Sequence, residues 1–294
     1  MHPIKYKNIS IDGTRVFYRE SGPSDAPVML LLHGWPASSH MFRDLIPKLS
    51  GRFRLIAPDY PGFGHSEMPS PSEFDYSFDN ISNIIDKFID KLEIKKLSLY
   101  VQDYGGPVGF RVATRRPQLI QSIIVQNAIA HLDGVSDALQ PLMNYWEAKS
   151  PENELAVRSL LSLETTKFQY LHGAANSENI CPDTYTLNQA LLDRAGNDII
   201  QLNLLYDYRN NVEKFSEWQS YFRQHKPPML VVWGQNDPFF TSAGAHAFAK
   251  ENANVTVRLL PAGHFALEEN SFEIATEILA LADRVELHTA TSTY

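Results

Sequence analysis

The sequence lacks most of the features that would direct a protein to a membrane or an oxidising compartment. It has one cysteine, Cys181, which cannot form an internal disulfide and therefore indicates a reducing compartment. No apolar run approaches the roughly 18 residues that a spanning helix needs, and residues 1–6 contain no apolar signal segment. We therefore expect a soluble, cytoplasmic protein with no membrane partner, present as a monomer or homodimer.

Positive charge is also sparse. The 294 residues include 26 Lys and Arg against 34 Asp and Glu, which gives a formal charge of −8, and basic residues cluster no further than the pairs Lys95-Lys96 and Arg115-Arg116. Because an acidic surface repels phosphate backbones, we expect no nucleic-acid partner. The hydrophobic share of 44% is sufficient for one large α/β domain, or for such a domain with an insertion.

The chain does contain a regular alternation of strand and helix patterns. Two alternating segments, 4–11 and 14–20, flank Asp12-Gly13, a dipeptide typical of a two-residue hairpin turn. Six short apolar runs follow, and runs that are hydrophobic on both faces indicate buried parallel strands. This order predicts an α/β fold with a doubly wound, mostly parallel sheet. The runs occupy residues 28–32, 53–57, 97–101, 121–126, 229–233 and 255–260, and helical patterns lie at 39–49, 79–93, 105–115, 242–250 and 270–284.

One stretch, 129–226, interrupts this alternation. It has helical periodicities and many aromatic residues but no buried-strand pattern. We expect residues 1–128 and 227–294 to form the core, and 129–226 to form a helical cap inserted before the last two strands. Because the insertion begins where the carboxyl edge of the sheet opens, it would cover a site there and exclude water.

The most informative short segment is Leu97–Gly106, where a strand runs into a glycine pair. A strand, sharp turn and helix of this kind form a nucleophile elbow, which in its common form carries serine in G-x-S-x-G. Here Asp103 occupies the serine position. A carboxylate is ionised at neutral pH without the help of a base, and it attacks an sp3 carbon more readily than an amide or ester. Asp103 therefore predicts alkyl transfer to the carboxylate, followed by hydrolysis of the resulting ester.

Two further chemically active residues follow predicted strands at the same edge of the sheet. Asp237 comes after the 229–233 run, and His264 comes after the 255–260 run. The order nucleophile, acid, histidine is that of a catalytic triad in which Asp237 orients the imidazole and His264 transfers protons.

The segment His33-Gly34-Trp35-Pro36 follows the strand at 28–32. In this position the backbone N–H of Trp35, with that of Tyr104 after the nucleophile, would form an oxyanion hole. A cis peptide bond between Trp35 and Pro36 would direct the Trp35 amide inward.

With these motifs the chain resembles the α/β-hydrolase superfamily over nearly its whole length. Within it, the chain is similar to the branch with an aspartate nucleophile, which contains epoxide hydrolases and haloalkane dehalogenases. The segments His33–Pro36 and Leu205–Asn211 look like those of epoxide hydrolases, in which a tyrosine of the second segment donates a hydrogen bond to the epoxide oxygen. The resemblance implies that role for Tyr208, with Tyr145 as the second candidate and Tyr170 as a reserve.

Other residues are similar to haloalkane dehalogenases. Val101-Gln102-Asp103 resembles one subgroup of them, but those enzymes carry a tryptophan after the nucleophile, and its indole N–H holds the departing halide. Tyr104 stands in that position here, so a halide site would need an indole from Trp35, Trp146 or Trp218. We expect Trp35, Tyr104 and Trp146 to contact the substrate.

Together these residues predict an epoxide hydrolase that needs no cofactor and no metal and acts on a small apolar organic substrate. Asp103 would form a hydroxyalkyl ester, water activated by His264 and Asp237 would hydrolyse it, and the product would be a vicinal diol. One alternative is a haloalkane dehalogenase with the same triad. A second alternative, from a different class, is a non-catalytic small-molecule receptor that keeps the lidded pocket.

Overall fold

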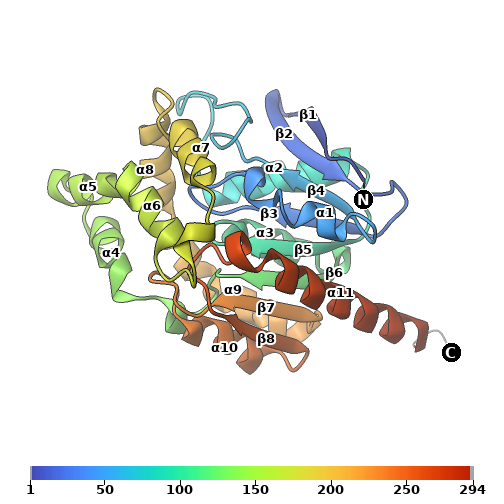
Figure 1. The fold of residues 1–294 in the computed structure, drawn as a ribbon. Helices are drawn as coiled ribbons and strands as arrows, with labels where there is room; N and C mark the ends of the chain where they lie inside the picture. The colour runs from blue at the N-terminus through green and yellow to red at the C-terminus, as the bar shows by residue number, and fades with distance from the viewer. Residues whose placement is uncertain (1, 292–294) are drawn as a thin grey trace.

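Within residues 2–291, which the structure describes, an eight-stranded sheet lies at the centre with helices on both faces (Figure 1). The structure is a computed structural model. The strand order is β1-β2-β4-β3-β5-β6-β7-β8, and the predicted α/β fold class is confirmed. The strands span Lys5–Ile11 (β1), Thr14–Ser21 (β2), Val28–Leu32 (β3), Arg54–Pro58 (β4), Leu97–Gln102 (β5), Ile120–Gln126 (β6), Met229–Gly234 (β7) and Val255–Leu260 (β8).

Strands β1 and β2 form the hairpin expected at the start of the chain. Between them, Asp12 and Gly13 have φ angles of 50° and 87°, the left-handed conformation that a two-residue turn requires. Strand β2 pairs antiparallel with β4, whereas the pairs from β4 onward are all parallel. The sheet is therefore parallel apart from this hairpin.

The middle strands are apolar on both faces because helices cover both sides of them. Every residue of β5 and of β7 is buried. Strand β8 differs from the buried strand that its sequence predicts, since its residues are exposed or half-buried. It lies at the end of the strand order, where a strand has a neighbouring strand on one side only.

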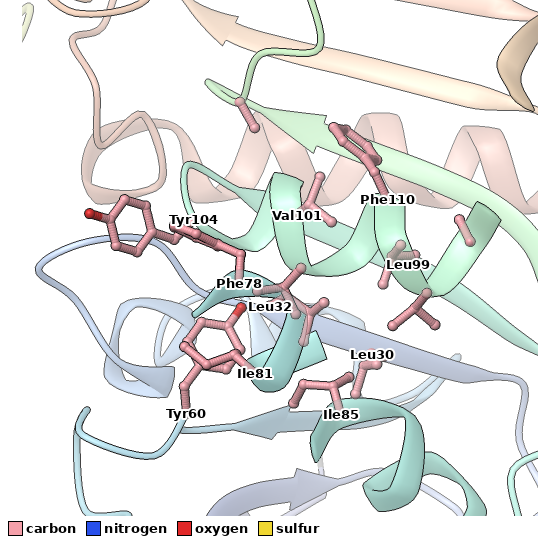
Figure 2. Close-up of a cluster of buried hydrophobic side chains, with 14 of the residues drawn as sticks. Leu30, Leu32, Tyr60, Phe78, Ile81, Ile85, Leu99, Val101, Tyr104 and Phe110 are labelled. Carbon is pink, nitrogen blue, oxygen red and sulfur yellow. The ribbon is translucent and has the colours of Figure 1, made fainter. Parts of the chain in front are cut away.

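Two hydrophobic cores lie on opposite faces of the sheet. The first includes α2 (Phe78–Lys91), α3 (Gly105–Arg115), α9 (Arg209–His225) and α10 (Ser242–Glu251), and the second includes α1 (Ile46–Leu49) and α11 (Leu267–Thr291). Figure 2 shows part of the first core, in which side chains of β3 and β5 meet those of α2 and α3. Tyr60, Phe78 and Tyr104 lie at one end of this cluster, so the packed core extends to the residue after Asp103.

The helix predicted over 39–49 is broken into a 3₁₀ turn at Ser39–Phe42 and the single turn of α1. Pro47 lies in this range, and because proline has no N–H and restricts the residue before it, a continuous helix cannot pass through. The other predicted core helices correspond to α2, α3, α10 and α11. In the part of the chain that the structure describes, no helix is long and apolar enough to cross a membrane.

Five helices between β6 and β7 lie together beyond one end of the sheet in Figure 1. Helix α9 also falls inside the insertion expected over 129–226, but it packs against α3 and α10, with Trp218 and Phe222 against Phe110. By these contacts α9 groups with the helices that flank the sheet. The five cap helices are α4 (Gln140–Glu147), α5 (Pro151–Arg158), α6 (Leu163–Leu171), α7 (Pro182–Leu192) and α8 (Asn197–Asp207).

Candidate active site

Asp103 stands at a sharp turn between the end of β5 and the start of α3. Its φ of 47° is in the left-handed region, as in a nucleophile elbow. The next turn of chain is tightly packed, because a Cβ on Gly105 would lie 2.2 Å from the carbonyl oxygen of Leu32. Only glycine fits there, so the elbow geometry depends on the residue type at position 105.

The Asp103 carboxylate is buried, and its two oxygens have different surroundings. Oδ1 accepts the backbone N–H of Trp35 at 2.7 Å, and the N–H of Tyr104 also hydrogen-bonds the carboxylate. Oδ2 lies 4.0 Å from Nε2 of His264. The peptide bond between Trp35 and Pro36 is cis. The structure thus brings both amides predicted for the oxyanion hole to Asp103, and Oδ2 remains the oxygen with access to a substrate carbon.

His264 is held on its other side by Asp237. Nδ1 of the imidazole lies 2.8 Å from Oδ2 of Asp237, and both side chains are buried. Because a carboxylate only accepts, Nδ1 carries the proton in the neutral ring, and Nε2 presents its lone pair toward Asp103. The three residues predicted as a triad therefore lie in one connected group.

Two residues that the sequence reasoning missed complete this group. Asn127, directly after β6, donates from Nδ2 to Oδ2 of Asp237 at 2.7 Å. Gln102 lies with its Nε2 3.1 Å from Nε2 of His264; it donates to the Nε2 lone pair when the proton is on Nδ1, and it must turn away before Nε2 can accept a proton from water. The sequence did contain a signal for both residues. Each is polar and lies at the end of a buried strand, where side chains lie at the carboxyl edge of the sheet.

Burial and neighbouring charge act on both titrating groups. Burial raises the pKa of the Asp103 carboxyl, although His264 and the amides of Trp35 and Tyr104 lower it. Burial would lower the pKa of the His264 imidazole, but the Asp237 carboxylate, its hydrogen bond and the charge of Asp103 together raise it. The net effect raises the pKa of both groups, so the imidazole accepts a proton more readily than a free histidine and the Asp103 carboxyl releases its proton less readily than a free aspartate.

A cavity of about 70 Å³ opens above Asp103 and is walled mainly by cap residues. Its lining is largely apolar and includes Leu142 of α4, Leu205 of α8, and Leu160 from the 3₁₀ turn at Ser159–Leu161. His, Cys, Asp and Glu side chains of the described residues form no group of three or more that could hold a metal ion. The cavity therefore suits a small, mostly apolar molecule in contact with Oδ2 of Asp103.

Two tyrosines line this cavity next to Asp103, Tyr208 at the end of α8 and Tyr104 at the elbow. Their rings lie 5.8 Å apart, centroid to centroid. Both hydroxyl oxygens are buried and have no hydrogen-bond partner among residues 2–286. Burial and then the Asp103 carboxylate raise the pKa of both phenols well above the ordinary value, so both remain protonated donors at neutral pH.

Tyr145, for which the resemblance implies a donor role, is not among the residues that line this cavity. Its ring is fully buried in a cap cluster with Val157 and Leu205, and it meets Tyr206 edge to face. Leu142, one turn earlier on α4, lines the cavity instead. Packing between α4, α5 and α8 thus places the Tyr145 ring among cap residues and away from Asp103.

The reserve candidate Tyr170 and the predicted substrate contact Trp146 also lie outside the cavity lining. The hydroxyl of Tyr170 accepts a hydrogen bond from Asn188 at 2.5 Å, and its ring stacks on Phe265. Trp146 stacks on Tyr208, so it supports that ring instead of contacting this cavity.

The three indoles considered for a halide site are not placed to serve one. Trp35 lines the cavity, but its Nε1–H donates to Oε1 of Gln201 at 3.0 Å. The Nε1–H of Trp146 donates to the carbonyl of Leu205 at 2.8 Å. Trp218 packs against Phe110 in the core beside the sheet, away from the cavity. None of these indoles offers an unpaired N–H to the cavity, whereas the phenols of Tyr104 and Tyr208 line it without a partner among the described residues.

Comparison with known proteins agrees with the fold. Residues 27–271 match the family model described as the alpha/beta hydrolase fold. An uncharacterized hydrolase of Saccharomyces cerevisiae is 43% identical over 275 residues, which cover 92% of this chain and 94% of that protein. The chain belongs to the α/β-hydrolase family and is a hydrolase.

Haloalkane dehalogenases are also among its relatives. One from Mycolicibacterium paratuberculosis is 27% identical over 281 residues, covering 90% of this chain and 87% of that protein. The crystal structure of haloalkane dehalogenase DbeA from Bradyrhizobium elkani superposes with a TM-score of 0.81 and 24% identity, covering 97% of this chain and all of that chain. The chain is thus similar in sequence to a haloalkane dehalogenase over most of its length, and it shares the fold of another.

Proposed function

We propose that the protein is an epoxide hydrolase that converts small epoxides to vicinal diols through a covalent ester on Asp103. The observation that carries this proposal is the pair of phenols in the cavity lining, Tyr104 and Tyr208, whose buried hydroxyls have no partner among the described residues. An epoxide oxygen leaves as an alkoxide and needs a hydrogen-bond donor, whereas a halide is stable as an anion and needs only a weak N–H. The indoles of Trp35 and Trp146 donate elsewhere.

In the first step, Oδ2 of Asp103 attacks one ring carbon. A carbon–oxygen bond to the aspartate forms as the bond from that carbon to the ring oxygen breaks, and the electron pair stays on the ring oxygen. The Tyr208 and Tyr104 hydroxyls donate to this oxygen, and one of them gives it a proton. Such positioned acid catalysis contributes about 10² to 10⁴-fold.

In the second step, Nε2 of His264 takes a proton from water, and the resulting hydroxide attacks Cγ of Asp103. The negative charge develops on Oδ1, which already accepts the Trp35 N–H at 2.7 Å, and each such donor is worth roughly 3 to 4 kcal/mol. The bond between Cγ and Oδ2 then breaks, and the departing alkoxide takes the proton of the hydroxyl newly bound to Cγ, which releases the diol and restores the carboxylate. The proton on His264 returns through solvent to the phenolate formed in the first step, so the net reaction consumes one water.

The test replaces each phenol and uses Tyr145 as a matched control. In a His264→Gln background, which blocks ester hydrolysis, Tyr208→Phe and Tyr104→Phe should each slow adduct formation with 1,2-epoxybutane at least ~10-fold. Tyr145→Phe removes the same hydroxyl outside the cavity and should change the rate less than ~2-fold. Intact-protein mass against time measures the adduct.

The runner-up is a haloalkane dehalogenase that uses Asp103, His264 and Asp237, and the relatives with that activity motivate it. Bromide released from 1-bromobutane by the parent enzyme distinguishes the two. Bromide release far faster than consumption of any epoxide, or a double Tyr208→Phe, Tyr104→Phe variant as fast as the parent, would favour the dehalogenase.

A further inference from the structure

Two polar side chains of the cavity lining take no part in the proposed reaction, and one of them is Gln169. This residue lies on cap helix α6 and lines the cavity. It is 3% exposed, and its Nε2 has no hydrogen-bond partner within the described part of the chain. Burying an amide N–H without a partner costs free energy that a leucine at the same position would not incur.

The neighbouring polar side chains of α6 do have partners. The Thr165 hydroxyl, which also lines the cavity, donates to the carbonyl of Ser159 at 2.9 Å. Thr166 donates to Gln189 at 2.7 Å, and the Nε2 of Gln189 donates to the carbonyl of Leu161. The packing of the cap thus satisfies these polar groups, whereas Gln169 is a cavity-lining residue with a buried donor that has no partner among the described residues.

Gln169 and the two phenols lie in different parts of the cavity lining. Tyr208 packs on Tyr104 and Phe78. Helix α6 packs on the side of the triad histidine, since Phe168 contacts Phe239 and Phe239 contacts His264. An epoxide whose ring oxygen meets the phenols would therefore extend a substituent toward α6.

We propose that Gln169 binds a hydrogen-bond acceptor on that substituent, so the preferred substrates are small epoxides that carry a hydroxyl, ether or carbonyl oxygen beside the ring. This inference rests on the proposed function. The cavity of about 70 Å³ is smaller than the roughly 150 Å³ apolar cavity that holds benzene in an engineered protein, which limits the substituent to a few non-hydrogen atoms.

Glycidol and 1,2-epoxybutane provide the test, because they have the same size and differ by a hydroxyl in place of a methyl. We expect the parent to prefer glycidol in kcat/KM by at least ~10-fold, since a site built for a polar group discriminates against the apolar analogue. Gln169→Leu should lose this preference, with glycidol reduced at least ~10-fold and 1,2-epoxybutane within ~3-fold of the parent. Gln169→Met and thermal unfolding of each variant check that the loss does not come from misfolding.

Thr165→Val is the matched control. It removes a hydroxyl from a residue of the same cavity lining, and that hydroxyl already donates a hydrogen bond within the cap. It should leave the glycidol preference unchanged. If Gln169→Leu slows both substrates equally and the Asp103 ester accumulates, Gln169 acts on the hydrolytic water, and the inference is wrong. An unchanged preference in Gln169→Leu also overturns it. If the parent opens neither epoxide, the proposed function itself fails.

Discussion

Replacing Asp237 with asparagine tests how His264 is held, because the surroundings leave the new amide one favourable orientation. Oδ1 of Asp237 accepts the backbone N–H groups of Phe239 at 2.8 Å and Phe240 at 3.1 Å. Oδ2 accepts from Nδ1 of His264 and from Asn127. The imidazole can change tautomer and the Asn127 side chain can rotate, whereas the two backbone amides can do neither. The carbonyl oxygen in Asp237→Asn should therefore take the Oδ1 position and the NH₂ should face His264.

This orientation moves the imidazole proton to the wrong nitrogen. Nδ1 must then accept from the new NH₂, so Nε2 carries the hydrogen and has no lone pair for water. Nε2 also lies 3.1 Å from the amide nitrogen of Gln102, which has to rotate to avoid two opposed N–H groups. The base of the second step is lost, while Oδ2 of Asp103 still attacks without any base.

The two steps should therefore respond very differently to Asp237→Asn. In a serine protease the corresponding change lowers kcat about 10⁴-fold through the same tautomer error. We expect ester hydrolysis to slow roughly 10³ to 10⁴-fold, equivalent to about 4 to 5.5 kcal/mol, and ester formation to slow by less than ~10-fold. Rapid-quench samples with 1,2-epoxybutane, analysed by intact-protein mass, should show an adduct of one substrate molecule that persists.

Asp12→Asn serves as the control, since Asp12 lies in the exposed turn of the β1–β2 hairpin and asparagine tolerates its positive φ. Both steps should keep the parent rate in that variant. Ester hydrolysis in Asp237→Asn within tenfold of the parent, or an equal slowing of both steps, would refute the tautomer explanation.

Three further outcomes follow from the same geometry. A single turnover in oxygen-18 water should label the Asp103 peptide, because water attacks Cγ; label in the diol alone would contradict the ester. The rate of ester hydrolysis should fall as the pH drops through the pKa of His264, because protonated His264 cannot act as the base. Asp237 raises this pKa above its ordinary value of 6.5 despite burial, so a pH–rate profile from stopped-flow with its midpoint below 6.5 would contradict this explanation. Gly105→Ala should lower the free energy of unfolding by about 2 to 3 kcal/mol, because its Cβ would lie 2.2 Å from the Leu32 carbonyl. Gly51→Ala is the control, because nothing lies within 4 Å of its added Cβ, and it should leave the midpoint of urea unfolding unchanged. If Gly105→Ala and Gly51→Ala unfold at the same urea concentration, the clash with Leu32 is not destabilising.

Local sequence patterns were sufficient to predict those features of this protein that depend on interactions between residues close in the sequence. The fold class follows from apolar runs alternating with helical periods, and the hairpin follows from Asp12-Gly13, because turn geometry depends on neighbouring residues. The predicted positions of Asp103, Asp237 and His264 at strand ends rest on the same logic, since the ends of parallel strands meet at one edge. The exposure of β8 did not follow, because it depends on which strand lies at the edge of the sheet.

Only the tertiary structure decided which polar side chains face the cavity and which already have partners. The Trp35 indole is occupied by Gln201, a residue 166 positions away, and Tyr145 is packed within the cap while the Tyr104 phenol lines the cavity. Contacts over such separations leave no periodic trace in the sequence, because side-chain direction depends on how the cap helices settle against the sheet. The sequence therefore determined the type of nucleophile, because a local motif carries it, whereas the packing of the cap determined which hydrogen-bond donors surround it.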